Sequence, residues 1–91
     1  MPSDTKLVLT PTYTTRGAMD TLIGDDVEAA LARHFAGDWG DVCEEDRRSN
    51  DLALSFGQRL LSSYRDRRGS KFWIITEADR SATTVLLPDE Y

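Results

Sequence analysis

The sequence has few of the residues that build covalent and metal-bound sites. Its 91 residues include one cysteine, Cys43, and one histidine, His34. One cysteine excludes a disulfide within these residues, and one of each is too few for a zinc site. The start has neither the basic nor the apolar region of a secretory signal, and no apolar run approaches the roughly 18 residues of a membrane span. We therefore expect a cytoplasmic protein without membrane contact, metal or cofactor.

Basic residues are also in deficit, and they are unevenly placed. There are 11 Lys and Arg against 16 Asp and Glu, for a net charge of −5. Because nucleic-acid binding depends on cations that neutralise phosphates, this sum argues against direct contact with nucleic acid. Residues 24–58 hold nine acids and three arginines, whereas residues 59–71 hold four arginines and a lysine against one acid. Charge alone leaves open whether the acidic segment or the basic turn from Arg65 to Lys71 is the functional surface.

The first third of the chain predicts a short strand followed by helices. Residues 6–11 are an apolar run that ends in proline, which indicates a strand at the edge of a sheet. Thr15 is a suitable cap for a short helix that ends at Gly24. Asp25 and Glu28 have the spacing of a capping box for the next helix. Five residues of that helix recur at helical spacing and are expected to face the core: Val27, Ala30, Leu31, His34 and Phe35.

A turn bounded by glycines and a third helix follow. The sequence Gly-Asp-Trp-Gly at 37–40 breaks the helical pattern, and we expect Trp39 to fold back against the apolar stripe. The third helix is predicted over residues 44–56 and is ended by the glycine that follows. Leu52 and Phe56 are four residues apart, so they are expected on its buried face.

The last third of the chain predicts a sheet. Two β-rich runs at 71–77 and 82–87 flank a short charged connection, which indicates a β-hairpin, and residues 58–65 supply a third strand. We therefore expect one α+β domain over residues 1–91. Its elements run β-α-α-α-β-β-β, with a three-stranded antiparallel meander, an added N-terminal strand and helices on one face. Trp73 and Ile75 would lie on the other face, which either the tail or the first helix covers or a partner contacts.

His34 and Cys43 are the candidates for a base and a nucleophile. A Cys-His enzyme needs the two side chains within hydrogen-bond reach. His34 lies on the apolar stripe of its helix, which favours a histidine at the edge of the core, satisfied by one hydrogen bond. Cys43 has no cationic neighbour in sequence to lower its pKa. We therefore expect no catalytic residue and no enzyme.

An acidic cluster between residues 38 and 51 has two interpretations. Acids are favourable at a helix N-terminus, and the cluster lacks the Asp-x-Asp-x-Asp-Gly order of a calcium loop, so no metal is expected. Otherwise it is an interaction surface that steers toward a basic partner, with an aromatic side chain as apolar anchor. The candidate partner-binding residues are Asp38, Trp39, Asp41, Glu44, Glu45, Asp46, Asp51 and Trp73.

The basic segment suggests an alternative. The predicted order of elements, a strand, helices and a meander, is that of the RelE-like toxins, which cleave RNA. In such a site Arg59, Tyr64 and Arg80 could serve as acid-base or phosphate-holding groups. Those toxins are usually strongly basic, whereas this chain is acidic. Arg80 also lies in the hairpin connection, where a role in turn architecture is the better interpretation.

Two long motifs stand out in residues 31–91. They are Gly-Asp-Trp-Gly at 37–40 and Trp-Ile-Ile-Thr-Glu-Ala-Asp-Arg-Ser at 73–81, continued by Thr83-Thr84 and Leu86-Leu-Pro88. Together with Leu31-Ala-Arg-His34, Glu45-Asp46, Asn50, Arg59-Leu-Leu-Ser62, Tyr64 and Tyr91, they resemble a family of small bacterial proteins carried on plasmids and other mobile elements. The resemblance implies no catalytic residue.

A mobile-element setting implies an accessory role. We expect a non-enzymatic inhibitor that occupies the basic groove of a host nucleic-acid-binding defence complex, of anti-CRISPR or anti-restriction type. The RelE-like toxin is the alternative. Whether the chain forms a homodimer through a sheet edge is left open.

Overall fold

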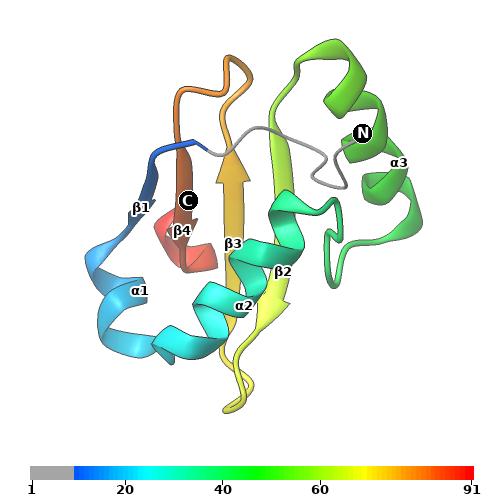
Figure 1. Ribbon diagram of the computed structural model, residues 1–91. Helices are drawn as coiled ribbons and strands as arrows, with labels where there is room; N and C mark the ends of the chain where they lie inside the picture. Colours follow the sequence, from blue (N-terminus) through cyan, green and yellow to red (C-terminus); the bar gives the residue numbers. More distant parts are fainter. Residues whose placement is uncertain (1–9) are drawn as a thin grey trace.

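The computed structural model describes residues 10–91, which form a four-stranded mixed sheet with three helices (Figure 1). The elements are β1 (Thr12–Thr14), α1 (Arg16–Thr21), α2 (Gly24–Phe35), α3 (Glu44–Phe56), β2 (Leu60–Arg65), β3 (Lys71–Thr76), β4 (Thr83–Leu86) and the 3-10 turn η1 (Pro88–Glu90). The strand order is β1-β4-β3-β2, with β1 parallel to β4 and the other pairs antiparallel. The predicted α+β class, element order and meander are confirmed. Within residues 10–91 no helix has the length and apolar character needed to cross a bilayer.

The N-terminal strand lies later in the chain than its sequence predicted. β1 begins at Thr12, directly after the proline that was expected to end the strand, and residues 6–9 of the predicted strand lie outside the described residues. Pro11 has no N–H to donate, but its carbonyl accepts from Thr83 N at 2.9 Å. At the other end of β1, Thr15 N donates to Val85 O at 3.0 Å. The expectation of an edge strand is confirmed.

A local side-chain cap begins α1, whereas a contact with a distant residue holds the first turn of α2. The Thr15 side chain caps α1 by accepting from Ala18 N at 3.2 Å, as predicted. The predicted capping box at Asp25 is wrong, because the N-cap of α2 is Ile23, two residues earlier, and it makes no side-chain bond. Asp26 in the first turn instead binds Arg67, 41 residues away, through two guanidinium nitrogens.

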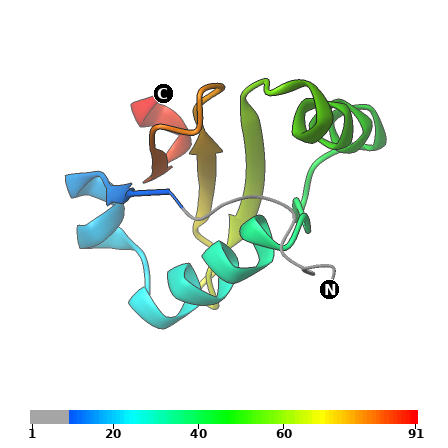
Figure 2. The ribbon, with the colours of Figure 1, turned by 45° about the horizontal axis from the view of Figure 1, so that its top comes forward.

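One core lies between α2 and the face of the sheet that α2 covers. Figure 1 shows α2 crossing in front of β3 and β2, and Figure 2 places η1 on the opposite side of the sheet. The buried side chains of this core are Ala18, Ala30, Tyr64, Phe72, Ile74 and Val85, with Leu22, Val27, Leu31 and Leu87 packed against them. The predicted apolar stripe of α2 therefore does face the core.

The second face of the sheet is partly covered by the C-terminal tail. Tyr91 meets Trp73 edge-on with ring centroids 5.6 Å apart, and β3 contacts η1. Ile75 and Leu86 on this face are buried, whereas Trp73 is half-buried. Of the two coverings considered from the sequence, the tail is the one found, and it leaves the end of the face near Lys71 exposed.

His34 is the centre of a buried polar network. Its Nδ1 lies 2.6 Å from Ser62 Oγ and its Nε2 lies 2.8 Å from Thr76 Oγ1, which in turn lies 2.8 Å from Thr83 Oγ1. Burial, together with the positive charge of Arg80, lowers the pKa of His34 to about 4. The prediction of a histidine at the core edge with one hydrogen bond is wrong, because the imidazole is fully buried and makes two.

Candidate protein-binding site

The loop before α3 acts as an extra partner for strand β2. Ser63 N donates to Trp39 O at 3.1 Å, and Asp41 N donates to Ser63 O at 2.7 Å. Gly40 lies between them with a φ of +73°, and a Cβ there would overlap the Ser63 carbonyl oxygen. Only glycine combines this left-handed backbone with so close an approach. The loop therefore covers part of the outer edge of β2 and fixes where α3 begins.

Trp39 is a structural residue of this loop. It is 0% exposed, and its indole N–H donates to Asp51 Oδ1 at 2.9 Å. Its ring also meets the His34 ring edge-on, with centroids 5.6 Å apart. The prediction that Trp39 folds back onto the α2 stripe is confirmed. Its expected role as an apolar anchor for a partner is wrong, because the side chain has no exposed surface.

α3 is held beside β2 by a side-chain bridge that replaces a strand. Asn50 Nδ2 donates to Leu61 O at 2.7 Å, and Leu61 N donates to Asn50 Oδ1 at 3.3 Å. This amide satisfies backbone groups that an edge strand otherwise exposes. One turn later, the buried Ala53 packs in a cluster with Phe35, Trp39 and Leu60. Asn50 and Ala53 thus define the inner face of α3.

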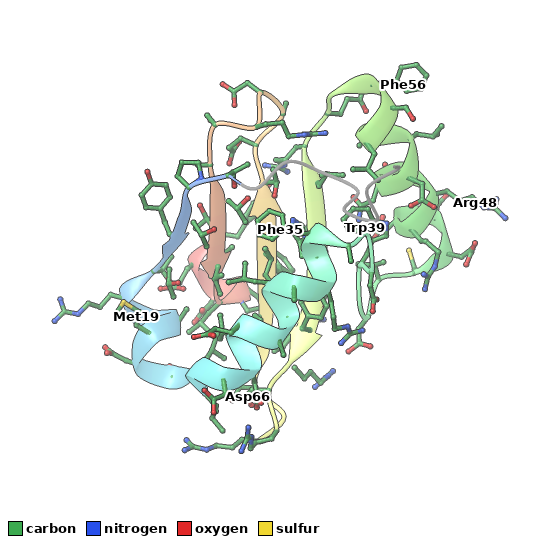
Figure 3. The ribbon with its side chains drawn as sticks, in the orientation of Figure 1. Met19, Phe35, Trp39, Arg48, Phe56 and Asp66 are labelled. Carbon is green, nitrogen blue, oxygen red and sulfur yellow. The ribbon has the colours of Figure 1, made fainter. Side chains whose placement is uncertain are left out.

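The far side of α3 carries exposed apolar side chains. Leu52 is 59% exposed and Phe56 is 72% exposed, so the prediction that they form the buried face of the helix is wrong. At 3.6 residues per turn, Leu52 lies about 130° around the helix from the middle of the face set by Asn50 and Ala53, and Phe56 lies about 90° from it. Figure 3 shows Arg48 and Phe56 pointing away from the body of the protein. We name the outward residues Glu44, Glu45, Arg48, Leu52 and Phe56 the α3 surface.

Three acids of the predicted site have structural partners. Asp38 pairs with Arg33 at 2.8 Å, and the hydrogen bond from that guanidinium lowers the pKa of Asp38. Glu44 lies 3.6 Å from both Arg47 and Arg48. Asp51 accepts the hydrogen bond of the Trp39 indole.

The other acids of the predicted site are exposed. Asp41, Glu45 and Asp46 take part in none of the ion pairs found among residues 10–91. Asp46 N donates to the Cys43 Sγ that caps α3, at 3.4 Å, Glu45 lies in the first turn of that helix, and Asp41 N is bonded to Ser63 O. Of the predicted partner-binding residues, only Glu44 and Glu45 belong to the α3 surface. Trp73 lies on β3 against Tyr91, away from it.

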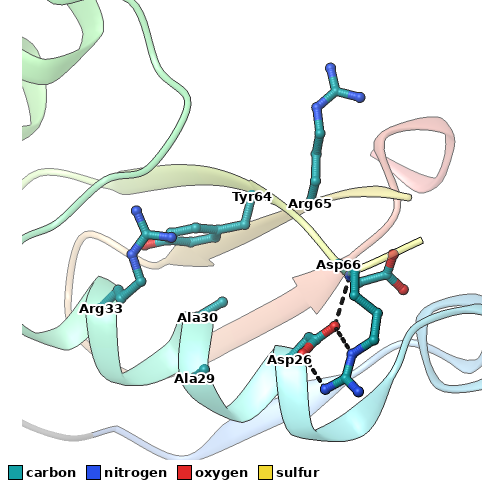
Figure 4. A pocket seen from close by; sticks show the side chains of 8 residues that line it. Asp26, Ala29, Ala30, Arg33, Tyr64, Arg65 and Asp66 are labelled. Atoms are coloured by element: carbon teal, nitrogen blue, oxygen red, sulfur yellow. Dashed lines mark hydrogen bonds and ion pairs between the residues drawn. The ribbon is translucent and has the colours of Figure 1, made fainter. Parts of the chain in front are cut away.

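The residues considered for a toxin-like site do not converge. Tyr64 is buried, its hydroxyl donates to the Asp38 carbonyl, and burial raises its pKa to about 12. Arg59 precedes β2 and Tyr64 lies five residues further along it, so their Cα atoms are about 16 Å apart. A pocket of about 270 Å³ beside Tyr64 contains Arg33, whose guanidinium lies 4.9 Å from the ring centroid (Figure 4).

Arg80 has the turn role that its sequence position favoured. Its guanidinium donates to the carbonyls of Gln58 at 2.7 Å, Glu77 at 3.1 Å and Ala53 at 3.1 Å. It therefore ties the hairpin connection to the C-terminal end of α3. Its own backbone has a φ of 61°, an unusual value for a residue with a Cβ.

The two other candidate sites, a Cys-His pair and a metal site, are not assembled among residues 10–91. Cys43 is exposed at the start of α3, and both nitrogens of His34 are bonded to hydroxyls in the interior, so the two form no nucleophile-base pair. Across residues 10–91, no cluster of three or more His, Cys, Asp or Glu side chains is arranged to hold a metal ion. The chain matches no protein-family model, and no match is found among curated proteins or solved structures.

The exposed pair on α3 was missed because its sequence pattern is ambiguous. Residues 52–54 are all apolar, so a helix over them has two candidate inner faces. The structure selects the face of Asn50 and Ala53. The signal available in the sequence was a polar residue, Asn50, at helical spacing from Ala53, where an amide can complete an edge strand.

Proposed function

We propose that this protein is a non-enzymatic accessory protein that binds a protein partner through the α3 surface. The observation that carries the proposal is the pairing of features on one outward helix face. Leu52 and Phe56 are exposed there, and the same helix begins with Glu44, Glu45 and Asp46. Aromatic anchors with charged neighbours are typical of protein-binding surfaces, whereas isolated exposed apolar residues need no explanation.

The rigidity of α3 supports this use. The inner face is fixed by the Asn50 bridge to Leu61 and the Asp51 bond to Trp39, so the outward side chains are presented on a preformed helix. Binding then costs little conformational entropy in the helix backbone. Removing Leu52 and Phe56 from water contributes roughly 1.5–3 kcal/mol for each side chain that becomes fully buried.

The acids give the partner its chemistry. Glu45 of the α3 surface and the nearby Asp41 and Asp46 are exposed carboxylates that take part in none of the ion pairs found among residues 10–91, so they attract a surface rich in Lys and Arg. A groove that binds nucleic acid is such a surface. Together with the mobile-element resemblance, this supports a host nucleic-acid-binding defence complex as the target, of anti-CRISPR or anti-restriction type. Inhibition would be stoichiometric, by occupation of the groove.

The experiment is capture of partners from a bacterial lysate, followed by binding measurements with the purified partner. We expect a Lys- and Arg-rich nucleic-acid-binding protein whose binding is competed by its own nucleic acid and weakened by salt. Reversing Asp41, Glu44 and Glu45 to lysine should abolish that binding. Reversing Asp20 and Glu28 to lysine, on α1 and α2, is the control and should not.

Two results would reject the proposal. One is binding that persists, insensitive to salt, in the α3 charge-reversal variant. The other is degradation of RNA by the purified protein that is lost on replacement of Tyr64 or Arg80, which would favour the RelE-like alternative.

A further inference from the structure

Two cations face each other directly across the β2–β3 hairpin. Arg65 and Lys71 are register partners at its end, and both are exposed. Neither takes part in any of the ion pairs found among residues 10–91. Like charges at directly opposed positions destabilise a sheet. Residues that lower the stability of a fold are expected where function requires them. Here, an anionic ligand would relieve the repulsion between Arg65 and Lys71.

The turn that joins these strands is rigid. The Asp66 carboxylate is buried and accepts from Arg68 N and Ser70 N, each at 3.0 Å, and from Ile23 N at 3.2 Å. Arg67 is fixed by its ion pair with Asp26 at 2.9 Å. The cations at this end of the sheet therefore project from a preorganised backbone, which lowers the entropy cost of binding.

Aromatic side chains continue the same sheet face. Trp73 is two residues from Lys71 on one strand, so both side chains point away from α2. Beside Trp73 lies Tyr91, which is 65% exposed, and the Arg59 guanidinium lies 5.4 Å from the centroid of the Tyr91 ring. Glu77 shares this face by alternation but is six residues from Lys71, about 20 Å along the strand direction.

We infer that this face binds single-stranded nucleic acid. Arg65 and Lys71 would contact phosphates, while Trp73 and Tyr91 offer aromatic surface to unpaired bases. Cations interleaved with aromatic side chains on a sheet are the combination that single strands require, since bases in a duplex are not free to stack on protein. The net charge of the chain argued against such contact, but nine of its 16 acids lie in residues 24–58. Asp89 and Glu90 of η1 do lie on this side of the sheet (Figure 2), where the Glu90 carboxylate accepts hydrogen bonds from Thr15 Oγ1 at 2.6 Å and Leu87 N at 2.8 Å. The inference does not depend on the α3 surface.

The test uses Arg65→Glu in the full chain, because this change separates binding from folding. It replaces a repulsive pair by an attractive one opposite Lys71, so the variant should unfold at a higher temperature than the parent. The matched control is Arg16→Glu, the same charge change at an exposed position of α1, near the opposite edge of the sheet. The probes are fluorescein-labelled single-stranded RNA, single-stranded DNA and duplex DNA, each of about 12 nucleotides. This length is within the range bound by small domains that bind single strands.

Fluorescence anisotropy should show that the parent and Arg16→Glu bind single strands more tightly than duplex. Their affinity for single strands should fall as the salt concentration rises from roughly 50 to 200 mM. Arg65→Glu should bind about tenfold more weakly and lower the salt slope by about 0.7, the share of one phosphate contact. Preference for RNA or for DNA would identify the natural strand. No binding by the parent, tighter binding to duplex, equal losses in both variants, or loss in Arg65→Glu together with a lower Tm would each overturn the inference.

Discussion

The buried histidine predicts how stability depends on pH. His34 is fully buried between two hydroxyls, and its pKa falls from 6.5 to about 4 because burial penalises the charged ring and Arg80 is nearby. A difference of about 2.5 units between the folded and unfolded states corresponds to roughly 3 kcal/mol. Above pH 6.5 the ring is neutral in both states, and this contribution to stability is complete. As the pH falls toward 4, the unfolded chain gains the proton first and the contribution is lost.

Other titrating groups act at lower pH. Hydrogen bonds lower the pKa values of Asp26, Asp79 and Glu90 from ordinary values of 3.8, 3.8 and 4.5. Their stabilisation is present above those values and is lost only as the pH falls through the lowered ones. The interval between pH 6.5 and about 4.5 therefore reports chiefly on His34.

The assay is urea unfolding at several pH values between 7 and 4.5, followed by tryptophan fluorescence. Trp39 is a suitable probe because it is buried against the histidine ring. We expect the free energy of unfolding to fall by roughly 2–3 kcal/mol across this interval. His34→Gln, which keeps an amide for hydrogen bonding but does not titrate, should be less stable at pH 7 and nearly independent of pH. A flat profile in the parent, or the same slope in the variant, would refute the reasoning.

Two further substitutions test how α3 and its loop are attached. Gly40→Ala should lower the free energy of unfolding by more than about 1 kcal/mol, because its φ is +73° and a Cβ overlaps the Ser63 carbonyl. Gly24→Ala, at a helical position with open space, is its control and should be neutral or stabilising in the same urea titration. Asn50→Ala leaves the N–H and carbonyl of Leu61 without their bridge, so a loss of about 1–3 kcal/mol is expected by thermal or urea unfolding. A loss below about 0.5 kcal/mol would show that water replaces the bridge.

Much of the fold could be predicted because its signals are local. Helical spacing placed the buried stripe of α2, which includes Ala30 and Phe35. The glycines around Trp39 correctly indicated a turn, and Gly57 ends α3 with a φ of +69° as a left-handed cap. The alternation in residues 71–77 gave the strand and its two faces.

The errors arise where a distant residue decides the outcome. Asp25 and Glu28 have capping-box spacing, yet the hairpin turn supplies Arg67 to Asp26 and fixes the start of α2 without a cap. The inner face of α3 was predicted from Leu52 and Phe56 but is set by contacts with β2, which begins only after the helix ends. Pairing across the chain does not follow from periodicity, so apolar periodicity alone could not place Leu52 and Phe56 on the exposed side of α3.

The most direct test of the proposed function is the affinity of the captured partner for Phe56→Ala. Phe56 is 72% exposed, so its removal should leave the free energy of unfolding within about 0.5 kcal/mol of the parent. Met19→Ala is the control, since Met19 is 68% exposed on α1, away from the α3 surface. If the α3 surface binds the partner, titration calorimetry should show Kd rising at least about tenfold for Phe56→Ala and unchanged for Met19→Ala. An unchanged Kd for Phe56→Ala would contradict the account.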